Sequence, residues 1–359
     1  MRRTSPILGL FGLVLLAGCD DTVDANVSSS TVTTGAVGSS SGSGASTTSS
    51  GAGGAGSSAS ASTSTSTSTS TTGATTGAGT GGGAPLGCGL PIPTSDSEYT
   101  LPFGGADRTF RVHVPPGLDA STPAPLVMVF HGYLEDGDQI ETITKMTPAA
   151  DARGYVVVYA DGLGKSWNAG GCCGSSASNG VDDVGFVGAM IDFVEAHHCI
   201  DPKRVYAAGF SNGGMLSHRL ACEMSERIAA IGPVSGTMAI DACAPSRPVP
   251  VMHFHGTSDF VVAYANGGLS GAKGVDETMA GWVMRDACTA SPHVVFQQGS
   301  ATCESWSPCA AGADVVRCKL QGGGHQWPGG NSAGPGGTIN MDIAASEAML
   351  DFFTEHPLP

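Results

Sequence analysis

The sequence predicts an α/β domain in which helices cover both faces of a mostly parallel central sheet. Residues 85–359 account for 275 of the 359 residues, a length typical of one large α/β domain. Apolar runs of strand length recur within them and are nearly continuous, as expected for strands buried on both faces. Segments with apolar residues at helical spacing alternate with these runs, which is the pattern of a parallel sheet.

The expected strands follow one another along the chain. Residues 108–114 (RTFRVHV) alternate polar and apolar side chains, which predicts an antiparallel edge strand. Five later runs predict buried strands: 126–130 (LVMVF), 155–160 (YVVVYA), 204–209 (RVYAAG), 228–234 (IAAIGPV) and 249–255 (VPVMHFH). A further strand is expected before the glycine-rich stretch at 322–324.

Helical spacing predicts helices at 182–198, 213–226, 276–288 and 344–353. Asp182 or Asp183 is available to cap the first of them. Residues 162–181 show no periodicity, and a loop of this length in a compact domain is often functional or stapled. Two adjacent cysteines in this loop offer the staple, and Trp167 offers a surface for a ligand.

The first 19 residues have the pattern of a lipoprotein signal peptide. Two arginines precede an apolar run, Ile7 to Ala17, that is too short for a typical membrane span. Leu16 to Cys19 (LAGC) resembles the lipobox of bacterial lipoproteins, in which the cysteine becomes the lipid-bearing N-terminus. We therefore expect export, as a membrane-anchored lipoprotein of the periplasm or cell surface. The alternative is an extracellular protein in which Cys19 follows a glycine by coincidence.

Residues 20–84 consist almost entirely of Ser, Thr, Gly and Ala. Such a segment cannot bury enough apolar surface to offset its chain entropy, so it predicts a disordered tether. Residues 85–359 then form the folded domain, and membrane contact is expected only through the N-terminal lipid.

The expected domain is acidic. Excluding two arginines and three aspartates before residue 85 from the totals of 16 basic and 31 acidic residues leaves a formal charge of −14. This balance disfavours nucleic acid and anionic surfaces as partners. Neutral substrates and a monomeric domain are expected.

The chain has eleven cysteines, and the ten that follow Cys19 form an even number. In an exported protein this predicts up to five disulfides. Zinc is not expected, because the cysteines lack paired Cys-x-x-Cys spacing. Cys303 and Cys309 are close enough in sequence to close a small loop, with Cys288 and Cys318 flanking it, although spacing alone does not determine the pairing.

Residues 207–215 (AAGFSNGGM) place Ser211 in the pattern Gly-x-Ser-x-Gly, after an expected strand and before an expected helix. This context is typical of a nucleophile elbow, a tight turn that lifts the serine hydroxyl above the sheet. Side chains at Gly209 or Gly213 would collide with neighbouring backbone. The alternative is an ordinary serine that begins a helix in a glycine-rich turn.

A nucleophilic serine needs a base, and the base needs a carboxylate that orients it. Asp259, in HGTSD, follows the strand expected at 249–255 and should lie at the same sheet edge as Ser211. His325, in GGGHQWPGG, follows another strand in a loop that glycines make adaptable. The order Ser211, Asp259, His325 is the chain order of α/β-hydrolase triads.

Acyl transfer also requires donors for the oxyanion. The strand at 126–130 is followed by His131, Gly132 and Tyr133, a position that commonly supplies one donor. We therefore expect the oxyanion to be held by the backbone N–H groups of Asn212, at the start of a helix, and Tyr133.

Other titratable residues are weaker candidates. His131 precedes the serine, which is the wrong order for the base, and His218 lies on the helix after the elbow. His253 and His255 alternate on one strand and are expected to be satisfied strand histidines, so no metal site is predicted. Asp286 falls beside a helix rather than at a strand end.

Several motifs together resemble a known family: HGY, YADG, WNAGGCCG, VDDVGF, GFSNGGM, HGTSD and GGGHQWPGG. They are similar to the secreted feruloyl esterases and poly(3-hydroxybutyrate) depolymerases, a family of α/β-hydrolases that also includes acetylxylan esterases. The resemblance covers about residues 86–356. It implies an α/β-hydrolase fold with Ser211 as nucleophile, Asp259 as orienting carboxylate and His325 as general base and acid.

By position, the resemblance also implies that Trp167, Tyr133 and Trp327 line the substrate pocket. No metal or organic cofactor is implied. The expected function is that of an exported serine carboxylesterase acting on feruloyl or acetyl esters of plant cell-wall polysaccharide.

A polyhydroxybutyrate depolymerase or oligomer hydrolase is the main alternative function. The depolymerase is disfavoured because the 34 residues after His325 have the pattern of a loop and a closing helix, not of a polymer-adsorbing domain, whereas this argument leaves soluble hydroxybutyrate oligomers open as substrates. An acyl transferase or a serine peptidase could use the same triad. A catalytically inactive surface binding protein would lack a triad member, whereas all three residue types are present in order.

Overall fold

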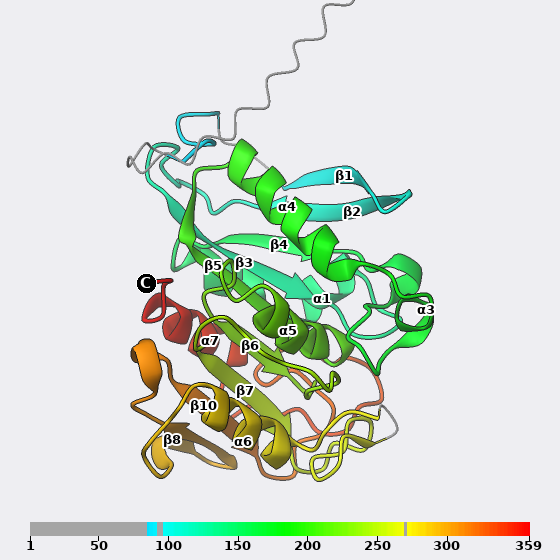
Figure 1. Ribbon diagram of the computed structural model, residues 1–359, viewed down its shortest axis with the longest axis vertical. Coiled ribbons are helices and arrows are strands. Elements are labelled where there is room, and N and C mark those ends of the chain that lie inside the picture. Colours follow the sequence, from blue (N-terminus) through cyan, green and yellow to red (C-terminus); the bar gives the residue numbers. More distant parts are fainter. Residues whose placement is uncertain (1–84, 92–95, 269–270) are drawn as a thin grey trace, which may run out of the picture. The chain divides into compact units, whose positions relative to one another are not determined.

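The computed structural model describes residues 85–91, 96–268 and 271–359, and these contain a ten-stranded sheet covered by helices on both faces (Figure 1). The predicted signal peptide with Cys19 (1–19) and the predicted tether (20–84) lie outside the described residues. In spatial order the strands are β1 (Ser97–Phe103), β2 (Ala106–His113), β4 (Val156–Ala160), β3 (Ala124–Phe130), β5 (Ile200–Phe210), β6 (Ile231–Val234), β7 (Val251–Gly256), β10 (Val315–Leu320), β9 (Ala301–Trp306) and β8 (His293–Gln298). The strands from β4 across to β10 run parallel, and antiparallel strands extend both edges. The predicted class is therefore confirmed.

The parallel strands are apolar because both of their faces are covered. All seven residues of β3 are buried. Its alternate side chains enter two different apolar clusters, Met128 on one side of the sheet and Val127 and Val129 on the other. A continuous apolar run is the sequence signature of such a strand.

Each cluster is closed by its own set of helices. The cluster that contains Met128 includes residues of α4 (Asp183–His197), α5 (Asn212–Glu223) and α6 (Val275–Arg285). The cluster on the opposite face includes residues of α1 (Gly137–Thr144), α2 (Met146–Asp151) and α7 (Ala345–Thr354). Figure 1 shows α4, α5 and α6 together on the near face of the sheet. Among the described helices, none combines the length and apolar character needed to cross a bilayer.

One prediction about elements is wrong, and several elements were not predicted. Residues 108–114 lie within an antiparallel strand as expected, but β2 is not at the edge, because β1 pairs with it along its whole length. The second hairpin, β8 with β9, extends the other edge and was not predicted. The helices α1 and α2 were also not predicted.

A buried ion pair anchors the long loop at 162–181. Asp182 caps α4 by accepting a hydrogen bond from the Gly185 backbone, whereas Asp183 is fully buried and lies 2.7 Å from the guanidinium of Arg108. Asp183 also accepts a hydrogen bond of 2.7 Å from the backbone N–H of Asn168. The loop itself contains a short 3₁₀ turn, η1 (Leu163–Lys165), and a single turn of helix, α3 (Gly174–Ser178).

The described residues contain five disulfides, which accounts for all ten cysteines beyond Cys19. They are Cys88–Cys199, Cys172–Cys173, Cys222–Cys243, Cys288–Cys309 and Cys303–Cys318. The Cys303–Cys309 pair that proximity in sequence would allow does not form. Cys303 and Cys318 face each other across the β9–β10 ladder, so the strand register sets the pairing rather than proximity in sequence.

Candidate active site

Ser211 stands in a strained turn between β5 and α5. Its φ of 53° and ψ of −116° lie outside the usual regions for a residue with a side chain. The turn is possible because both flanking glycines touch backbone: a Cβ on Gly209 would collide with Gly213, and one on Gly213 would collide with the carbonyl of Phe130. The strand–turn–helix context predicted for the elbow is therefore present, and Ser211 is largely buried, with 9% of the residue exposed.

Asp259 and His325 meet at the carboxyl edge of the parallel strands. Asp259 follows β7 and His325 follows β10, the strand that pairs with β7. The Nδ1 atom of His325 lies 2.8 Å from Oδ2 of Asp259. The imidazole also packs on the ring of Phe210, with 4.8 Å between centroids, and Phe210 immediately precedes Ser211. All three predicted triad residues thus lie in one region, although they come from distant parts of the chain.

The Asp259 carboxylate is held in its ionised form. Burial raises its pKa, but hydrogen bonds and charge interaction with His325 outweigh this effect, and the pKa lies below its ordinary value. The backbone N–H groups of Val261 and Val262 donate to Oδ1, each at 2.9 Å. Oδ1 is therefore held by the loop and Oδ2 is left to orient His325.

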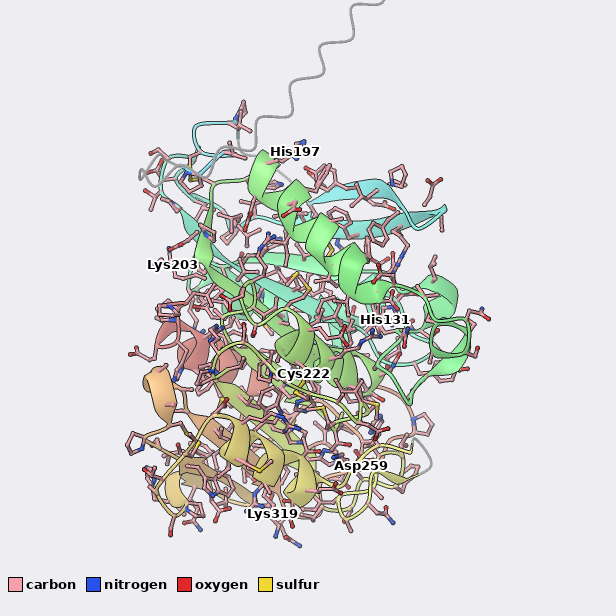
Figure 2. The ribbon with its side chains drawn as sticks, viewed as in Figure 1. His131, His197, Lys203, Cys222, Asp259 and Lys319 are labelled. Carbon is pink, nitrogen blue, oxygen red and sulfur yellow. A yellow bond between two sulfur atoms is a disulfide. The ribbon has the colours of Figure 1, made fainter. Side chains whose placement is uncertain are left out.

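The loop after β3 forms the opposite wall of the site. His131 is buried and bridges two backbone groups: its Nδ1 lies 2.7 Å from the Gly132 carbonyl, and its Nε2 accepts from the N–H of Gly162 at 2.9 Å. This arrangement requires a neutral ring with the proton on Nδ1, and burial lowers the pKa of His131 accordingly. His131 is thus a structural support, as its position in the chain suggested. Figure 2 shows His131 and Asp259 at the same edge of the sheet.

The two backbone N–H groups expected to hold the oxyanion are free to donate to a ligand. Within the described residues, neither the N–H of Tyr133 nor the N–H of Asn212 has an acceptor, whereas the N–H of Gly132 donates to the Glu135 carboxylate at 2.8 Å. The side chain of Asn212 makes a pair of hydrogen bonds with the backbone of Trp167, at 2.7 and 3.0 Å. These bonds join the start of α5 to the long loop.

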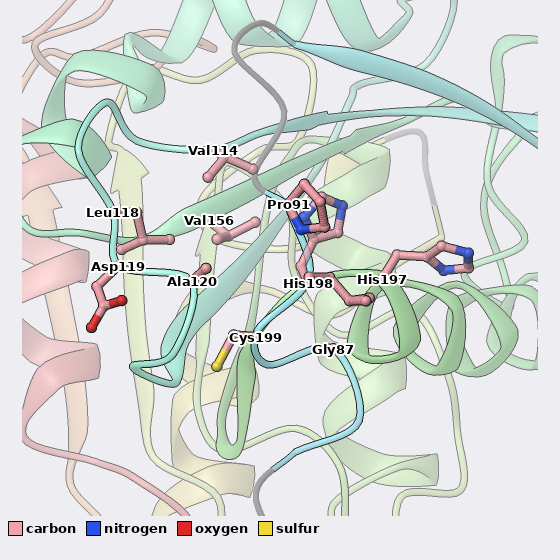
Figure 3. A pocket seen from close by; sticks show the side chains of 11 residues that line it. Gly87, Pro91, Val114, Leu118, Asp119, Ala120, Val156, His197, His198 and Cys199 are labelled. Atoms are coloured by element: carbon pink, nitrogen blue, oxygen red, sulfur yellow. The ribbon is translucent and has the colours of Figure 1, made fainter.

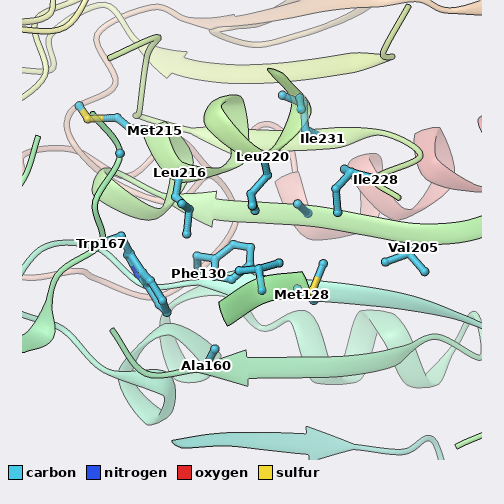
Figure 4. Close-up of a cluster of buried hydrophobic side chains, with 14 of the residues drawn as sticks. Met128, Phe130, Ala160, Trp167, Val205, Met215, Leu216, Leu220, Ile228 and Ile231 are labelled. Carbon is cyan, nitrogen blue, oxygen red and sulfur yellow. The ribbon is translucent and has the colours of Figure 1, made fainter. Parts of the chain in front are cut away.

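Trp167 and Trp327 do not line a pocket, which corrects that prediction. Both have 0% exposure. Trp167 packs against Phe130 within the apolar cluster (Figure 4), and its indole N–H donates to the carbonyl of His131 at 3.1 Å. The indole of Trp327 donates to Ser346 at 3.0 Å. The Trp167 indole therefore holds the loop after β3, and the Trp327 indole ties the His325 loop to α7. Of the three predicted lining residues, only Tyr133 is exposed, at 47%.

One small hollow lies far from these residues. Its volume is about 10 Å³, and it is lined by residues near the Cys88–Cys199 disulfide, including His198 and Val156 (Figure 3). Val156 begins β4, so this hollow is at the amino ends of the strands. It has no part in the candidate site.

Glu135, near the site, was not identified from the sequence, and His255, expected to be a satisfied strand histidine, also lies beside the Asp259 carboxylate. Glu135 is half-buried and interacts electrostatically with His325, and burial raises the pKa of its carboxyl group. His255 lies 3.4 Å from Oδ2 of Asp259 through its Nε2 atom. The HGTSD motif places a histidine four residues before the aspartate, but nothing in the pattern indicates that the two side chains meet.

Chemically, the arrangement brings a hydroxyl at a helix N-terminus into the region of an imidazole that is hydrogen-bonded to a buried carboxylate. The backbone N–H of Asn212, next to Ser211, and that of Tyr133 have no acceptor among the described residues. This set can activate a hydroxyl and stabilise an oxyanion, which are the two needs of acyl transfer.

Comparison with known proteins gives consistent matches. A family model described as Esterase PHB depolymerase matches residues 108–270, a stretch that contains Ser211 and Asp259 and ends before His325. The chain is 34% identical over 235 residues to feruloyl esterase B of Piromyces equi, which covers 61% of this chain and 42% of that protein. It is also 34% identical over 224 residues to the bifunctional acetylxylan esterase/xylanase XynS20E of Neocallimastix patriciarum, covering 62% of this chain and 31% of that protein. The chain thus spans less than half the length of these two relatives.

Among solved structures, the acetyl xylan esterase from Aspergillus awamori matches with a TM-score of 0.53. The two share 16% sequence identity over 72% of this chain and 99% of that chain. A likeness at this identity concerns the fold. The described domain has the α/β-hydrolase fold, as the motifs predicted.

Proposed function

We propose that this chain, which belongs to the family of feruloyl esterases and poly(3-hydroxybutyrate) depolymerases, hydrolyses carboxylic esters through Ser211. The observation that carries the proposal is the 2.8 Å contact between His325 and Asp259 at the sheet edge where Ser211 begins α5 with a positive φ. Each of the three residues is less than one-tenth exposed, so the charges that develop during reaction are partly shielded from water.

In the first half of the proposed reaction, the Ser211 hydroxyl oxygen attacks the ester carbonyl carbon while Nε2 of His325 takes the hydroxyl proton. The N–H groups of Asn212 and Tyr133 donate to the oxyanion. The carbon–oxygen bond to the alcohol then breaks, and His325 returns the proton to the leaving alkoxide.

In the second half, water attacks the acyl-enzyme and His325 accepts the water proton. Collapse of the second oxyanion intermediate breaks the bond between the acyl carbon and the Ser211 oxygen, His325 returns its proton to that oxygen, and the carboxylic acid is released. Asp259 accepts from the Nδ1–H of His325 throughout, which keeps Nε2 free to accept a proton. No step calls for a metal or an organic cofactor.

The proposed substrates are feruloyl or acetyl esters of plant cell-wall polysaccharide. The names of the two curated relatives support this class. Two exposed aromatic side chains adjoin the proposed machinery: Tyr133 carries one oxyanion donor, and Phe260, 66% exposed, follows Asp259. Exposed rings at these positions suit an apolar or aromatic acyl group. Hydroxybutyrate esters are the second candidate, which the description of the matching family model favours.

The proposed location is outside the cytoplasm. Five disulfides in the described residues are consistent with export to an oxidising compartment. We further propose that Cys19 carries the lipid anchor and that residues 20–84 tether the enzyme to the membrane. Mass spectrometry of the membrane fraction would detect a diacylated Cys19 peptide, and recovery of an unmodified peptide beginning elsewhere would overturn the anchor.

The test of function compares the wild-type chain with Ser211→Ala and with the matched control Ser217→Ala. Ser217 is buried on the same helix, where its hydroxyl donates to the Gly213 carbonyl at 3.0 Å. Initial rates are measured on methyl ferulate, acetylated xylan and hydroxybutyrate oligomers. We expect turnover on ferulate or acetyl-xylan that falls by about 10⁴-fold or more in Ser211→Ala and persists in the control.

The substrate panel separates the alternatives. Turnover fastest on hydroxybutyrate oligomers would replace the proposed substrate with the second candidate. Turnover that survives in Ser211→Ala would remove Ser211 from the mechanism. A wild-type chain that binds these esters without turnover would be a binding protein.

A further inference from the structure

Three buried histidines form a row that ends at the carboxylate of the proposed triad. His218 comes from α5, and His253 and His255 come from the same face of β7. Each is at most 1% exposed. The rings of His218 and His253 stack with 5.6 Å between centroids, and those of His253 and His255 with 5.3 Å. The proposed reaction uses none of these groups.

The acceptors around the row determine which nitrogen carries each proton. Nε2 of His255 lies 2.7 Å from the Val262 carbonyl, and a carbonyl only accepts, so Nε2 of His255 bears hydrogen. Nδ1 of a neutral His255 is then an acceptor. It lies 3.1 Å from Nε2 of His253, which must therefore be the donor. At the far end, the indole of Trp282 donates to Nδ1 of His218 at 3.0 Å, which places the His218 proton on Nε2.

Burial keeps these rings neutral. It lowers the pKa of His218 to about 3, and it lowers the pKa of His253 and of His255 as well. A neutral imidazole has one donor and one acceptor, so its hydrogen-bond partners decide its tautomer. The row therefore presents an N–H group, rather than a lone pair, toward Asp259.

The Nε2 atom of His255, whose hydrogen is donated to the Val262 carbonyl, also lies beside the carboxylate oxygen that His325 contacts. Nε2 of His255 lies 3.4 Å from Oδ2 of Asp259, while Nδ1 of His325 lies 2.8 Å from it on the other side. Val262 closes the arrangement, because its carbonyl accepts from His255 and its N–H donates to Oδ1 of Asp259 at 2.9 Å. The carboxylate is thus held by the Val262 N–H and by His325, and the N–H side of the His255 ring lies against it.

We propose that His255 is a positioning residue for the esterase reaction: its Nε2–H, held in place by Val262 and by the His253 contact, orients Oδ2 of Asp259 toward His325. The inference rests on the proposed function, since it assigns His255 to the same triad. With the N–H removed, Oδ2 loses the partial positive charge of this group and a neighbouring ring that limits its position. The negative charge of the Asp259 carboxylate then interacts mainly with His325. The orientation of the His325 ring becomes less defined, because Oδ2 is held less firmly.

The test uses the full chain with three substitutions at His255. His255→Gln keeps an amide N–H near the position of Nε2. His255→Asn places its amide near the position of Nδ1, so it retains a partner for His253 and lacks the donor toward Asp259. His255→Leu removes both polar groups. The matched control is His198→Leu, because His198 is also a buried histidine with an unpaired Nε2 atom, and it lies beside the Cys88–Cys199 disulfide away from the site.

The readouts are kcat and KM on the best ester substrate, the pH profile of kcat/KM, and the melting temperature. We expect His255→Asn and His255→Leu to lower kcat by about 10- to 100-fold with little change in KM, because a misplaced catalytic group costs rate rather than substrate binding. The acidic limb of the profile should move to higher pH, since more of the carboxylate charge then favours a protonated His325. His255→Gln should restore both the rate and the position of that limb.

The titratable groups that face His325 are Asp259 on the loop after β7, His255 on β7 and Glu135 on the loop after β3. Glu135→Gln therefore accompanies the series as a second control. The acidic limb of the kcat/KM profile should move in His255→Asn with Glu135 intact, and it should also move when His255→Asn is combined with Glu135→Gln. Such a result would assign the shift to the change at Asp259 and not to Glu135.

The outcomes are distinguishable. If wild type lacks Ser211-dependent turnover, the proposed function fails before His255 is tested. If wild type is active and His255→Asn or His255→Leu lowers only the melting temperature, with the pH profile unmoved, His255 is a packing residue and the inference is overturned. Equal loss in His255→Gln and His255→Asn would also overturn it, because the donor at Nε2 would then be irrelevant.

Discussion

Gly213 is the residue at which the turn around Ser211 has the least room. A Cβ placed there would overlap the backbone carbonyl of Phe130 and approach that of His131, and neither can move without shifting β3. By contrast, a Cβ on Gly188, in α4, would meet only the flexible end of Met224 at 3.5 Å. Both glycines lie in helices, so an alanine at either position gains the same helix propensity. The two substitutions therefore differ in the steric clash with neighbouring atoms.

We predict that Gly213→Ala abolishes measurable esterase activity and lowers the free energy of unfolding by about 2 kcal/mol or more, as overpacking against backbone does. Gly188→Ala should be neutral or should stabilise by up to about 1 kcal/mol, because alanine is the better helix former. Urea unfolding and ester turnover measured on both variants would check this. Full activity in Gly213→Ala would show that the turn does not need the glycine.

The chemistry of individual site residues could be predicted from sequence because each occurs in a motif with a fixed order. Ser211, Asp259 and His325 each follow a strand, and parallel strands bring their carboxyl ends together. The exposure of aromatic side chains could not be predicted in this way. Trp167 and Trp327 adjoin the site in sequence, but their large apolar surfaces are more stable beneath the loops than above them.

At the level of elements, Asp286 joins the end of α6 to the start of β7 in an unusual environment. Its Oδ1 accepts from the Val249 N–H at 3.0 Å, and its Oδ2 is buried without a hydrogen-bond partner among the described residues. Burial raises its pKa to about 7. The folded domain therefore retains a proton that the unfolded chain releases near pH 4.

The sign of the resulting pH dependence follows from linkage. Between about pH 4 and pH 7 the folded state binds more protons than the unfolded state, so this group makes the domain less stable as pH rises through that window. We predict that Asp286→Asn is more stable than wild type by a few kcal/mol at about pH 8 and nearly equal to it at about pH 4. Thermal unfolding at both pH values measures the difference. An equal difference at the two pH values would contradict the raised pKa.

The strands that could be predicted are those with an all-apolar pattern. The edge strands could not be predicted, because edge positions do not demand burial on both faces. Residues of β8 are mostly exposed, and those of β1 alternate between exposed and half-buried, so neither carries a strong apolar run. Their pairing depends on neighbouring hairpin partners rather than on local composition.

At the scale of the whole molecule, one of the five disulfides in the described residues joins segments that are distant in sequence. Cys88 precedes β1 and is bonded to Cys199, at the start of β5, across a separation of 111 residues. A crosslink that closes so long a loop restricts the unfolded chain strongly. This bond lies at the amino ends of the strands, away from Ser211, so it should affect stability and not chemistry.

We predict that the double variant Cys88→Ser, Cys199→Ser loses about 2–4 kcal/mol of unfolding free energy. Its kcat at a temperature where it remains folded should match that of wild type. Denaturant titration with and without a thiol reductant would check the predicted loss of unfolding free energy. Wild type in reductant, with its disulfides reduced, should lose more unfolding free energy than the double variant does. An unchanged unfolding midpoint in the double variant would contradict it.

The central claim is that Ser211 is a nucleophile activated by His325, and covalent labelling tests it most directly. The full chain is incubated with a fluorophosphonate, which forms a phosphorus–oxygen bond to an activated serine and releases fluoride. Peptide mapping by mass spectrometry then locates the adduct. The account predicts one adduct, on Ser211, that is absent in Ser211→Ala and forms far more slowly in His325→Ala. Hydrolysis by a chain that takes no label on Ser211, or that takes it on another residue, would contradict the account.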